Sequence, residues 1–449
     1  MRWRIGALLA GLVLLAGCGS AAPPPGPAPS AVPVPGGELL PGPGFPRTAV
    51  YFLEHDNLPV AQTLARYDVV VLDSEWAHRM PRDFFTTLRR INPHIVLLAY
   101  VDLVDLPPQL GTPDRWADRY RLWQFATEDR NRFPPQWLAR TADGTVLSEF
   151  PHTSMTNLTD RAPRVNGRTY AEYAADWVVD TVWSAGVWDG IFLDVWGDRV
   201  YGASRSHWDI DGDGRDEPDS AIYGPGKPWE RGIDDAERIM RLRMPTAVLV
   251  ANGDRTLRRR QLDGRVWESF ADPEAGRDAA SDLSSYVRAT ALGAHRLPGL
   301  ALTISRQRVE PGSADDLRRG RFFLTATMLQ NGYWAAMGPD YGRLAEYDEL
   351  DGGGLGPGYL GRPLLANPTP AQVQGPYANG VGRVAAGVFR RDFEHGIVLT
   401  NAGDAERTVT LERPYRRLSG KLDPHTNDGS VEQSVPIPAH DGLVLLRTK

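Results

Sequence analysis

Short apolar runs alternate with helix-like stretches over residues 49–336, and this alternation restricts the fold more than any other feature of the chain. The apolar runs are Ala49–Leu53, Val69–Leu72, Ile95–Val101, Gly190–Asp194, Ala247–Ala251, Arg265–Glu268, Leu300–Ile304 and Asn331–Ala336. The helical candidates between them include Arg82–Ile91, Tyr170–Ala185, Asp234–Arg243, Leu283–Leu292 and Ala314–Gln330. Apolar strands separated by helices predict an α/β fold with a parallel sheet that is buried on both faces.

The number of strand candidates favours one type of parallel sheet. Eight strands over roughly 300 residues fit a (β/α)8 TIM barrel with insertions. A doubly wound sheet fits less well, because we find no glycine-rich nucleotide-binding fingerprint after any of the predicted strands. We therefore expect the barrel to occupy residues 47–366.

The pattern changes after Ala366, where strand-like runs follow one another with no helical stretch between them. These runs are Val384–Phe389, Gly396–Thr400, Arg407–Leu411, Ser434–Pro438 and Gly442–Arg447. Turn-forming residues separate them, as at Asn401–Asp404 and Asn427–Gly429. Residues 367–449 are therefore predicted to form a C-terminal antiparallel β-sandwich domain.

The N-terminal segment is typical of a targeting signal. Arg2 and Arg4 precede an apolar run, Ile5–Ala16, which is too short for an ordinary membrane span. The only cysteine follows in Leu15-Ala16-Gly17-Cys18, which resembles the lipobox of bacterial lipoproteins. We expect residues 1–17 to be a lipoprotein signal peptide and Cys18 to carry the lipid.

Residues 19–46 contain ten prolines, with glycine, alanine and serine between most of them. Such a composition cannot bury a core and favours extended polyproline conformations. Residues 18–46 are thus predicted to be a tether. Together with the signal peptide, they predict an extracytoplasmic protein that is lipid-anchored to a bacterial membrane.

Composition excludes several classes of function. There are 50 Lys and Arg against 56 Asp and Glu, a formal net charge of −6, so no basic excess indicates a nucleic acid partner. One cysteine excludes disulfides within the chain and cysteine-rich zinc sites. We expect no organic cofactor.

Two carboxylates lie at the ends of predicted barrel strands, where barrel enzymes have their active sites. Asp194 ends the fourth strand and Glu268 the sixth. An unpaired carboxylate directly after an apolar strand is unfavourable in an apolar interior, so we expect both to face a polar cavity. Two acids among aromatic residues are what cleavage of a glycosidic bond requires. The predicted substrate is a polysaccharide or oligosaccharide.

Further polar and aromatic side chains at or near the strand ends are candidates for contacts to sugar. They are Asp73, Glu75, Trp76, Tyr100, Asp102, Trp196, Asn252 and Tyr333. Any of Asp73, Glu75 and Asp102 could instead cap a helix or pair with an arginine.

An acidic loop after the fourth strand matches part of a calcium-binding pattern. Asp209, Asp211 and Asp213 occupy positions 1, 3 and 5, with Gly214 at position 6 for the sharp turn. Arg215 and Glu217 follow at positions 7 and 9, while position 12 is serine in place of the usual glutamate. The loop predicts a structural Ca²⁺ site, and the alternative is a solvated acidic loop.

Several short motifs resemble the hypothetical glycosyl hydrolase-like families with barrel folds, and in particular the fifteenth of them. The motifs are Trp188–Asp194, Ala251–Asp254, Val266–Phe270, Tyr347–Leu350 and Leu360–Leu364; Phe389–Leu399 resembles the β-sheet module that ends many glycosidase chains. The resemblance implies that Asp194 is the nucleophile or transition-state stabiliser and that Glu268 is the general acid/base.

The sequence thus predicts a glycoside hydrolase that cleaves an extracellular or cell-envelope polysaccharide. One alternative is a non-catalytic carbohydrate-binding lipoprotein on a degenerate glycosidase barrel. A weaker alternative is a metal-dependent hydrolase that uses the acidic loop.

Overall fold

The computed structural model describes residues 44–53, 60–106, 133–151, 153–200, 207–253, 261–289 and 299–448. The predicted signal peptide, nearly all of the tether with Cys18, and Asp254 lie outside these residues. Within the described part of the chain, no helix combines the length and the apolar character needed to span a membrane.

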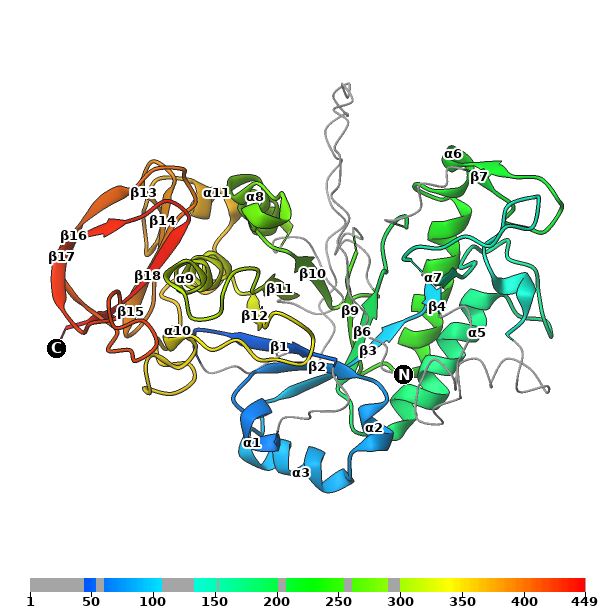
Figure 1. Ribbon diagram of the computed structural model, residues 1–449, viewed down its shortest axis with the longest axis horizontal. Coiled ribbons are helices and arrows are strands. Elements are labelled where there is room, and N and C mark those ends of the chain that lie inside the picture. Colours follow the sequence, from blue (N-terminus) through cyan, green and yellow to red (C-terminus); the bar gives the residue numbers. More distant parts are fainter. Residues whose placement is uncertain are drawn as a thin grey trace.

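Eight parallel strands close into a barrel at the centre of the molecule (Figure 1). They are β1 (Thr48–Phe52), β2 (Val69–Asp73), β3 (Val96–Asp102), β6 (Gly190–Asp194), β9 (Val248–Ala251), β10 (Gly264–Glu268), β11 (Leu300–Arg306) and β12 (Tyr333–Met337). Neighbours around the barrel follow one another in the sequence, and β12 pairs with β1 to close the ring. All eight predicted strands and the (β/α)8 fold are confirmed.

Helices cover the outside of the barrel strands. The longer ones are α3 (Arg82–Ile91), α5 (Tyr170–Trp177), α7 (Pro228–Arg243), α8 (Ala279–Ala289) and α9 (Ala314–Met328). Short ones are α1 (Ala61–Leu64), α2 (Trp76–Arg79), α6 (Asp219–Ile222), α10 (Asp348–Asp351) and α11 (Pro370–Gln374). The predicted helix from Tyr170 continues beyond α5 through a π-helical turn and a 3₁₀ turn, which ends at the left-handed Gly186.

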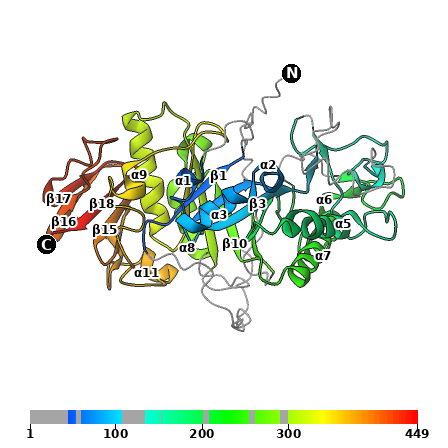
Figure 2. The ribbon, with the colours of Figure 1, turned by 90° about the horizontal axis from the view of Figure 1, so that it is seen from below.

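Insertions extend the barrel on the side of α5 and α7 (Figure 1). They carry two small antiparallel pairs, β4 (Asp105–Leu106) with β5 (Ser154–Met155) and β7 (His207–Trp208) with β8 (Glu217–Pro218). In the view from below, this extension and the C-terminal strands lie at opposite ends of the molecule, with the barrel between them (Figure 2).

The strands place their side chains alternately inside and outside the barrel, because successive residues of a strand point to opposite faces. On β6, Phe192 belongs to the cluster that fills the barrel, whereas Ile191 and Leu193 pack outward under the helices. The inner cluster also holds Tyr51 of β1 and Tyr100 of β3. The barrel therefore has a packed core, and a substrate can approach only at its ends.

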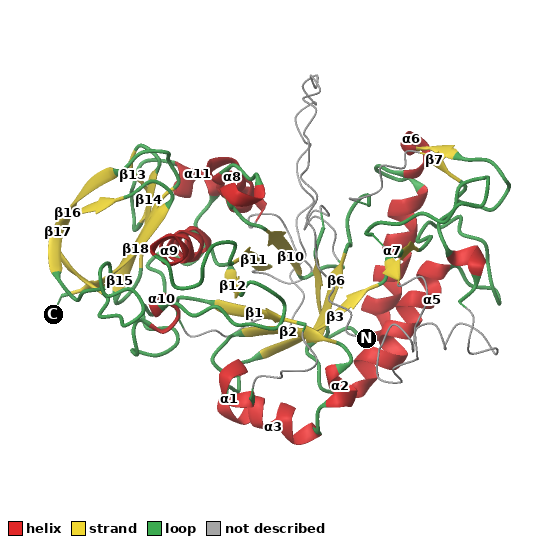
Figure 3. Ribbon diagram, in the orientation of Figure 1, coloured by secondary structure: helices red, strands yellow, loops and turns green. Residues whose placement is uncertain are grey.

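From Val381 on, the C-terminal module consists of strands and loops (Figure 3). The predicted domain 367–449 also contains one helix that we did not expect, α11, which precedes the sheet and contacts β13. Its strands are β13 (Val381–Ala385), β14 (Val388–Asp392), β15 (Gly396–Asn401), β16 (Arg407–Arg417), β17 (Val431–Ile437) and β18 (Asp441–Arg447). They form one six-stranded antiparallel sheet in the order β13-β14-β15-β18-β16-β17, where we expected the two sheets of a sandwich. The expected strand Val384–Phe389 is a hairpin, because Gly387 adopts a left-handed conformation (φ 73°) and turns the chain.

Helix α9 lies between the barrel and this sheet, against β15 and β18 on one side and β12 on the other (Figure 1). One apolar cluster spans the contact, with Phe322 and Trp334 from the barrel beside Phe393 and Val444 from the sheet. Arg321 of α9 adds buried ion pairs to Asp423 and Asp441. The barrel and the sheet thus share a core.

Candidate active site

Three side chains meet at the carboxyl ends of neighbouring strands. Asp194 ends β6, Asn252 directly follows β9, and Glu268 ends β10. Each lies two residues after a side chain of the inner cluster, namely Phe192, Val250 and Val266. Alternation along the strand therefore turns all three toward the mouth of the barrel.

Asn252 joins the two acids directly. Its Nδ2 donates to Oδ1 of Asp194 at 2.8 Å and to Oε2 of Glu268 at 3.1 Å. Those two oxygens therefore lie no farther apart than the combined length of the two bonds. The structure brings Asp194, Glu268 and Asn252 together at one place.

Three donors among the described residues hold Asp194. Its Oδ1 also accepts from the backbone N–H of Val195 at 2.9 Å, and its Oδ2 accepts from the Tyr100 hydroxyl at 2.6 Å. These hydrogen bonds fix the orientation of the Asp194 carboxyl group. Neither Asp194 nor Glu268 pairs with an arginine within the described part of the chain.

Glu268 has a different environment. Its side chain is exposed, and Oε1 has no partner within the described ranges. The mouth nevertheless crowds the carboxyl group, so that burial, together with the nearby charge of Asp194, raises its pKa. The Asn252 hydrogen bond and the charges of Arg308 and Arg306 oppose this rise. A carboxyl group of this kind can hold a proton and still reach a ligand.

The residues that follow the two acids share an uncommon backbone conformation. Val195 and Ser269 both have φ of 52°. This left-handed region is unfavourable for residues other than glycine, and most of all for a β-branched one. Such conformations persist only where the surroundings enforce them, and they concentrate at functional sites.

A buried ion network holds the turn after Glu268. Asp272 is fully buried and accepts from Arg308 on the loop after β11 (2.9 Å) and from Arg319 of α9 (2.5 Å). Arg308 also donates to the Ser269 hydroxyl at 3.2 Å. The position of Glu268 is thus tied to two other parts of the barrel.

Aromatic rings lie beneath and beside the carboxylates. Tyr51 packs against Tyr100 (ring centroids 5.8 Å apart), Phe192 (5.4 Å) and Tyr341 (5.8 Å). Burial, together with the charges of Glu268 and Asp194, raises the pKa of Tyr341 to about 12. We did not predict Tyr51 or Tyr341 from the sequence, although Tyr51 could have been found from the inward face of its strand.

Asp73 and Asp102 also lie at the carboxyl ends of their strands. Asp73 pairs with Tyr100, and Asp102 pairs with Asp194. Asp73 is half-buried and accepts the N–H of Glu75 at 3.3 Å. Asp102 is buried and accepts the N–H groups of Val104 and Asp105 at 3.0 Å. Both shape turns at the mouth, and their contact with sugar stays a prediction.

Four predicted sugar contacts are wrong. Glu75 is buried with Arg79 close by (3.5 Å), and Trp76 is fully buried against Phe84. Trp196 is fully buried and donates to Glu237 at 3.0 Å, because the left-handed Val195 breaks the alternation of the strand. The fourth is Tyr333, which begins β12 at the amino end of the barrel, opposite the acids. Its ring lies 5.4 Å from the Arg47 guanidinium.

The acidic loop brings its aspartates together as expected. Carboxylate oxygens of Asp209, Asp211 and Asp213 lie within 4.8 Å of one another. Within the loop, Asp213 accepts the N–H of Arg215 at 2.9 Å, and Glu217 accepts that of Ile210 at 3.0 Å. Backbone donors thus already use some of the carboxylate oxygens, and Ca²⁺ binding at these residues stays a prediction.

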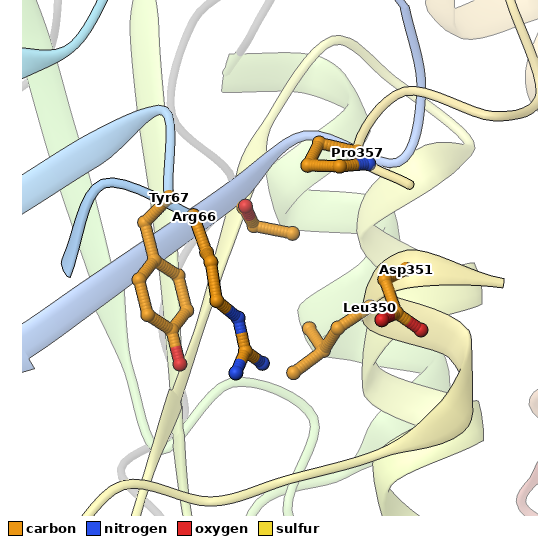
Figure 4. A pocket seen from close by; sticks show the side chains of 6 residues that line it. Arg66, Tyr67, Leu350, Asp351 and Pro357 are labelled. Atoms are coloured by element: carbon orange, nitrogen blue, oxygen red, sulfur yellow. The ribbon is translucent and has the colours of Figure 1, made fainter. Parts of the chain in front are cut away.

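A separate small recess lies at the amino ends of the strands (Figure 4). Its lining residues are Thr48, Arg66, Tyr67, Leu350, Asp351 and Pro357. Thr48 begins β1, and Arg66 and Tyr67 precede β2, so this recess lies away from the two acids. Arg66 is already paired with Glu346 at 2.8 Å. We assign it no part in the chemistry of the mouth.

A family model matches most of the barrel and part of the C-terminal sheet. Residues 89–397 match hypothetical glycosyl hydrolase family 15. The chain belongs to this family. Membership in hypothetical glycosyl hydrolase family 15 confirms the resemblance inferred from the short motifs. A search of curated proteins finds no match.

Solved structures with some similarity to this family member include sugar-cleaving enzymes. The glycoside hydrolase domain of PelA from Pseudomonas aeruginosa is 13% identical, with a TM-score of 0.38, and the match covers 66% of this chain and 96% of that one. Eubacterium rectale Amy13B is 10% identical (TM-score 0.44; 90% and 96% covered). The α-amylase from H. orenii is 10% identical (TM-score 0.42; 89% and 99% covered). The fold assignment itself stands on the strand order of this chain.

Proposed function

We propose that this protein hydrolyses O-glycosidic bonds of a polysaccharide with Asp194 and Glu268 as its two catalytic carboxylates. The observation that carries the proposal is the single amide nitrogen of Asn252, which bonds to both acids. Two acids at one barrel mouth, one held by several hydrogen-bond donors and the other with a raised pKa, match the division of work in glycosidases.

Asp194 acts as the nucleophile in this proposal. Three hydrogen-bond donors hold its carboxyl group and orient it for attack at the anomeric carbon. Glu268 acts as general acid/base. Its raised pKa lets it keep the proton that the leaving oxygen requires, and its Oε1 is open for that contact.

The spacing of the acids favours retention of anomeric configuration. Bonds of 2.8 and 3.1 Å to a shared nitrogen limit the separation of the two oxygens to less than about 6 Å. Inverting enzymes need roughly 6.5–9.5 Å between the carboxyl groups to admit a water, whereas retaining enzymes have about 5–5.5 Å. We therefore propose a double displacement through a glycosyl ester on Asp194.

The test begins with a screen of bacterial cell-wall and capsular polysaccharides for hydrolysis. With a substrate in hand, Asp194→Asn and Glu268→Gln should each lower kcat at least about 10³-fold while leaving the melting temperature nearly unchanged. NMR of the first product should show the anomeric configuration of the substrate. Sugar binding without turnover by the wild type would instead favour a carbohydrate-binding protein, and an inverted product would contradict the double displacement.

We also propose that the enzyme acts outside the cytoplasm as a lipoprotein anchored through Cys18. The support is the basic flank, the apolar run and the lipobox-like Leu15-Ala16-Gly17-Cys18. Mass spectrometry of the N-terminal peptide should find a lipid on Cys18, and Cys18→Ser should release the protein from the membrane fraction. An unmodified Cys18 in membrane-bound protein would contradict the proposal.

A further inference from the structure

At the carboxyl ends of the described barrel strands, some of the last side chains face the inside of the barrel. Arg306 is the cationic residue among them. The others are Asp73, Asp102, Asp194, Glu268 and Met337. Arg306 follows Leu300, Leu302 and Ile304 of the inner cluster at every second position of β11, so it faces the mouth. Strands β10 and β11 are neighbours, and Glu268 pairs with Ile304, two residues before Arg306, so Arg306 ends the strand next to the proposed general acid. Its positive charge acts on both Glu268 and Tyr341.

Only part of the Arg306 guanidinium forms hydrogen bonds to the described residues. Its Nε donates to the carbonyl of Pro339 at 2.9 Å, and one terminal nitrogen donates to the same oxygen. The other terminal nitrogen has no partner among the residues that the structure describes, and no carboxylate there pairs with Arg306. The outer edge of the guanidinium thus stays open while its inner edge is fixed.

Neighbouring arginines differ in this respect. Arg308 pairs with the buried Asp272 at 2.9 Å, and Arg343 pairs with Asp340 at 2.8 Å. Arg306 is half-buried, and its hydrogen-bond acceptor within the described residues is the neutral carbonyl of Pro339. Its charge acts on the carboxylates of Glu268 and Asp340, but none of the described carboxylates forms a direct ion pair with it, so a bound carboxylate could occupy the open edge of the guanidinium.

We propose that Arg306 binds a carboxylate of the substrate, so that the sugar seated beside Glu268 is an acidic one such as a uronic acid. This inference rests on the proposed function and names the substrate class. The planar guanidinium offers two parallel N–H donors that match a carboxylate. The raised pKa of Glu268 favours its neutral form, and this form would repel the carboxylate of such a sugar less than an ionised glutamate.

The test measures binding and hydrolysis separately on the full chain in detergent. Binding of D-glucuronate and D-galacturonate is compared with that of D-glucose and D-galactose by saturation-transfer NMR and calorimetry. The wild type should prefer the acids at least about tenfold, and Arg306→Gln should abolish the preference. Arg306→Lys keeps the positive charge but loses the two parallel N–H donors, so it should recover the preference for acidic sugars in part.

Arg343→Gln is the matched control, because Arg343 lies close to the same Pro339 segment and already has a carboxylate partner. It should leave the preference for acids unchanged. Hydrolysis of uronic-acid polysaccharides should fall at least tenfold once their carboxyl groups have been reduced to alcohols.

The outcomes distinguish this inference from the proposed function. Equal binding of acidic and neutral sugars, or a preference that survives Arg306→Gln in a protein with unchanged melting temperature, overturns the acidic-sugar inference even if neutral glycans are hydrolysed. A preference that depends on Arg306 without hydrolysis of any glycan supports the inference and overturns the proposed hydrolase.

Discussion

Asn252 donates both hydrogens of one amide to the two acids, and this shared contact has a consequence for the pH dependence of activity. The hydrogen bond to Glu268 lowers the pKa of that carboxyl, against the rise caused by burial and by Asp194. Activity requires Glu268 to be protonated, so it should fall as the pH rises through this pKa.

Asn252→Ala should therefore change two quantities. Without the amide the pKa of Glu268 rises further, and the alkaline limb of the pH profile of kcat should move to higher pH. The kcat at the optimum should fall about 10²-fold, since Asp194 also loses a donor. A profile of kcat and kcat/KM against pH checks both effects, and an alkaline limb that stays in place would contradict the role of Asn252.

Single residues also show which parts of the site could be predicted from the sequence and which could not. Asp194, Asn252 and Glu268 could be found because a polar residue directly after an apolar strand has few favourable places in a barrel. Trp76 and Trp196 were misplaced because a tryptophan near a strand end suits a helix interface as well as a mouth. The left-handed turn at Val195, which directs Trp196 outward, has no signature in the sequence.

At the level of elements, the eight barrel strands were predictable because parallel strands covered on both faces are continuously apolar. The predicted strand Leu300–Ile304 stopped one inward position too early, and this is why Arg306 was missed. The hairpin at Gly387 was read as one strand because the apolar residues on its two sides merge into a single run.

Helix α9 carries two adjacent arginines in opposite environments. Arg319 pairs with the buried Asp272, whereas Arg318 pairs with the exposed Asp315. Asp272→Ala leaves the buried Arg319 and the half-buried Arg308 without this counter-ion and should lower the free energy of unfolding by about 3–5 kcal/mol. Asp315→Ala, the control, should cost about 0–1 kcal/mol. Denaturant unfolding of both variants checks this, and equal effects would contradict it.

The acidic loop allows a test of the calcium prediction. If Asp209, Asp211 and Asp213 bind Ca²⁺, millimolar Ca²⁺ should raise the melting temperature and a chelator should reverse the rise. Asp211→Asn should weaken the response, whereas Asp428→Asn, on an exposed turn of the C-terminal sheet, should not. Hydrolysis should persist in the chelator, because the two proposed acids need no metal. A melting temperature that does not respond to Ca²⁺ would favour the solvated loop.

On the scale of the whole molecule, the barrel and the C-terminal sheet meet at a buried carboxyl group. Glu349 of α10 is buried beside Arg321 and accepts from Asn427 at 2.8 Å. Burial raises its pKa to about 7, although Arg321 and Asn427 oppose the rise. A raised folded-state pKa means that the folded state binds the proton more tightly than the unfolded chain does. Glu349 therefore reduces stability as the pH rises from its unfolded value through about 7.

Glu349→Gln should reveal this effect. At pH 5 the variant should match the wild type, because glutamine resembles the protonated acid. At pH 8 it should be more stable by on the order of 1–3 kcal/mol, since it avoids burying a charge. Thermal unfolding at the two pH values measures the difference. A variant that is equally or less stable at pH 8 would contradict it.

The described chain enters the barrel at Phe45, which packs against Phe393 just before β1 and so at the amino ends of the strands. The two acids lie at the opposite ends. If Cys18 carries a lipid, the tether would therefore join the barrel at the end opposite the two acids, and the chain that leads to the anchor would leave the catalytic opening uncovered at its point of entry.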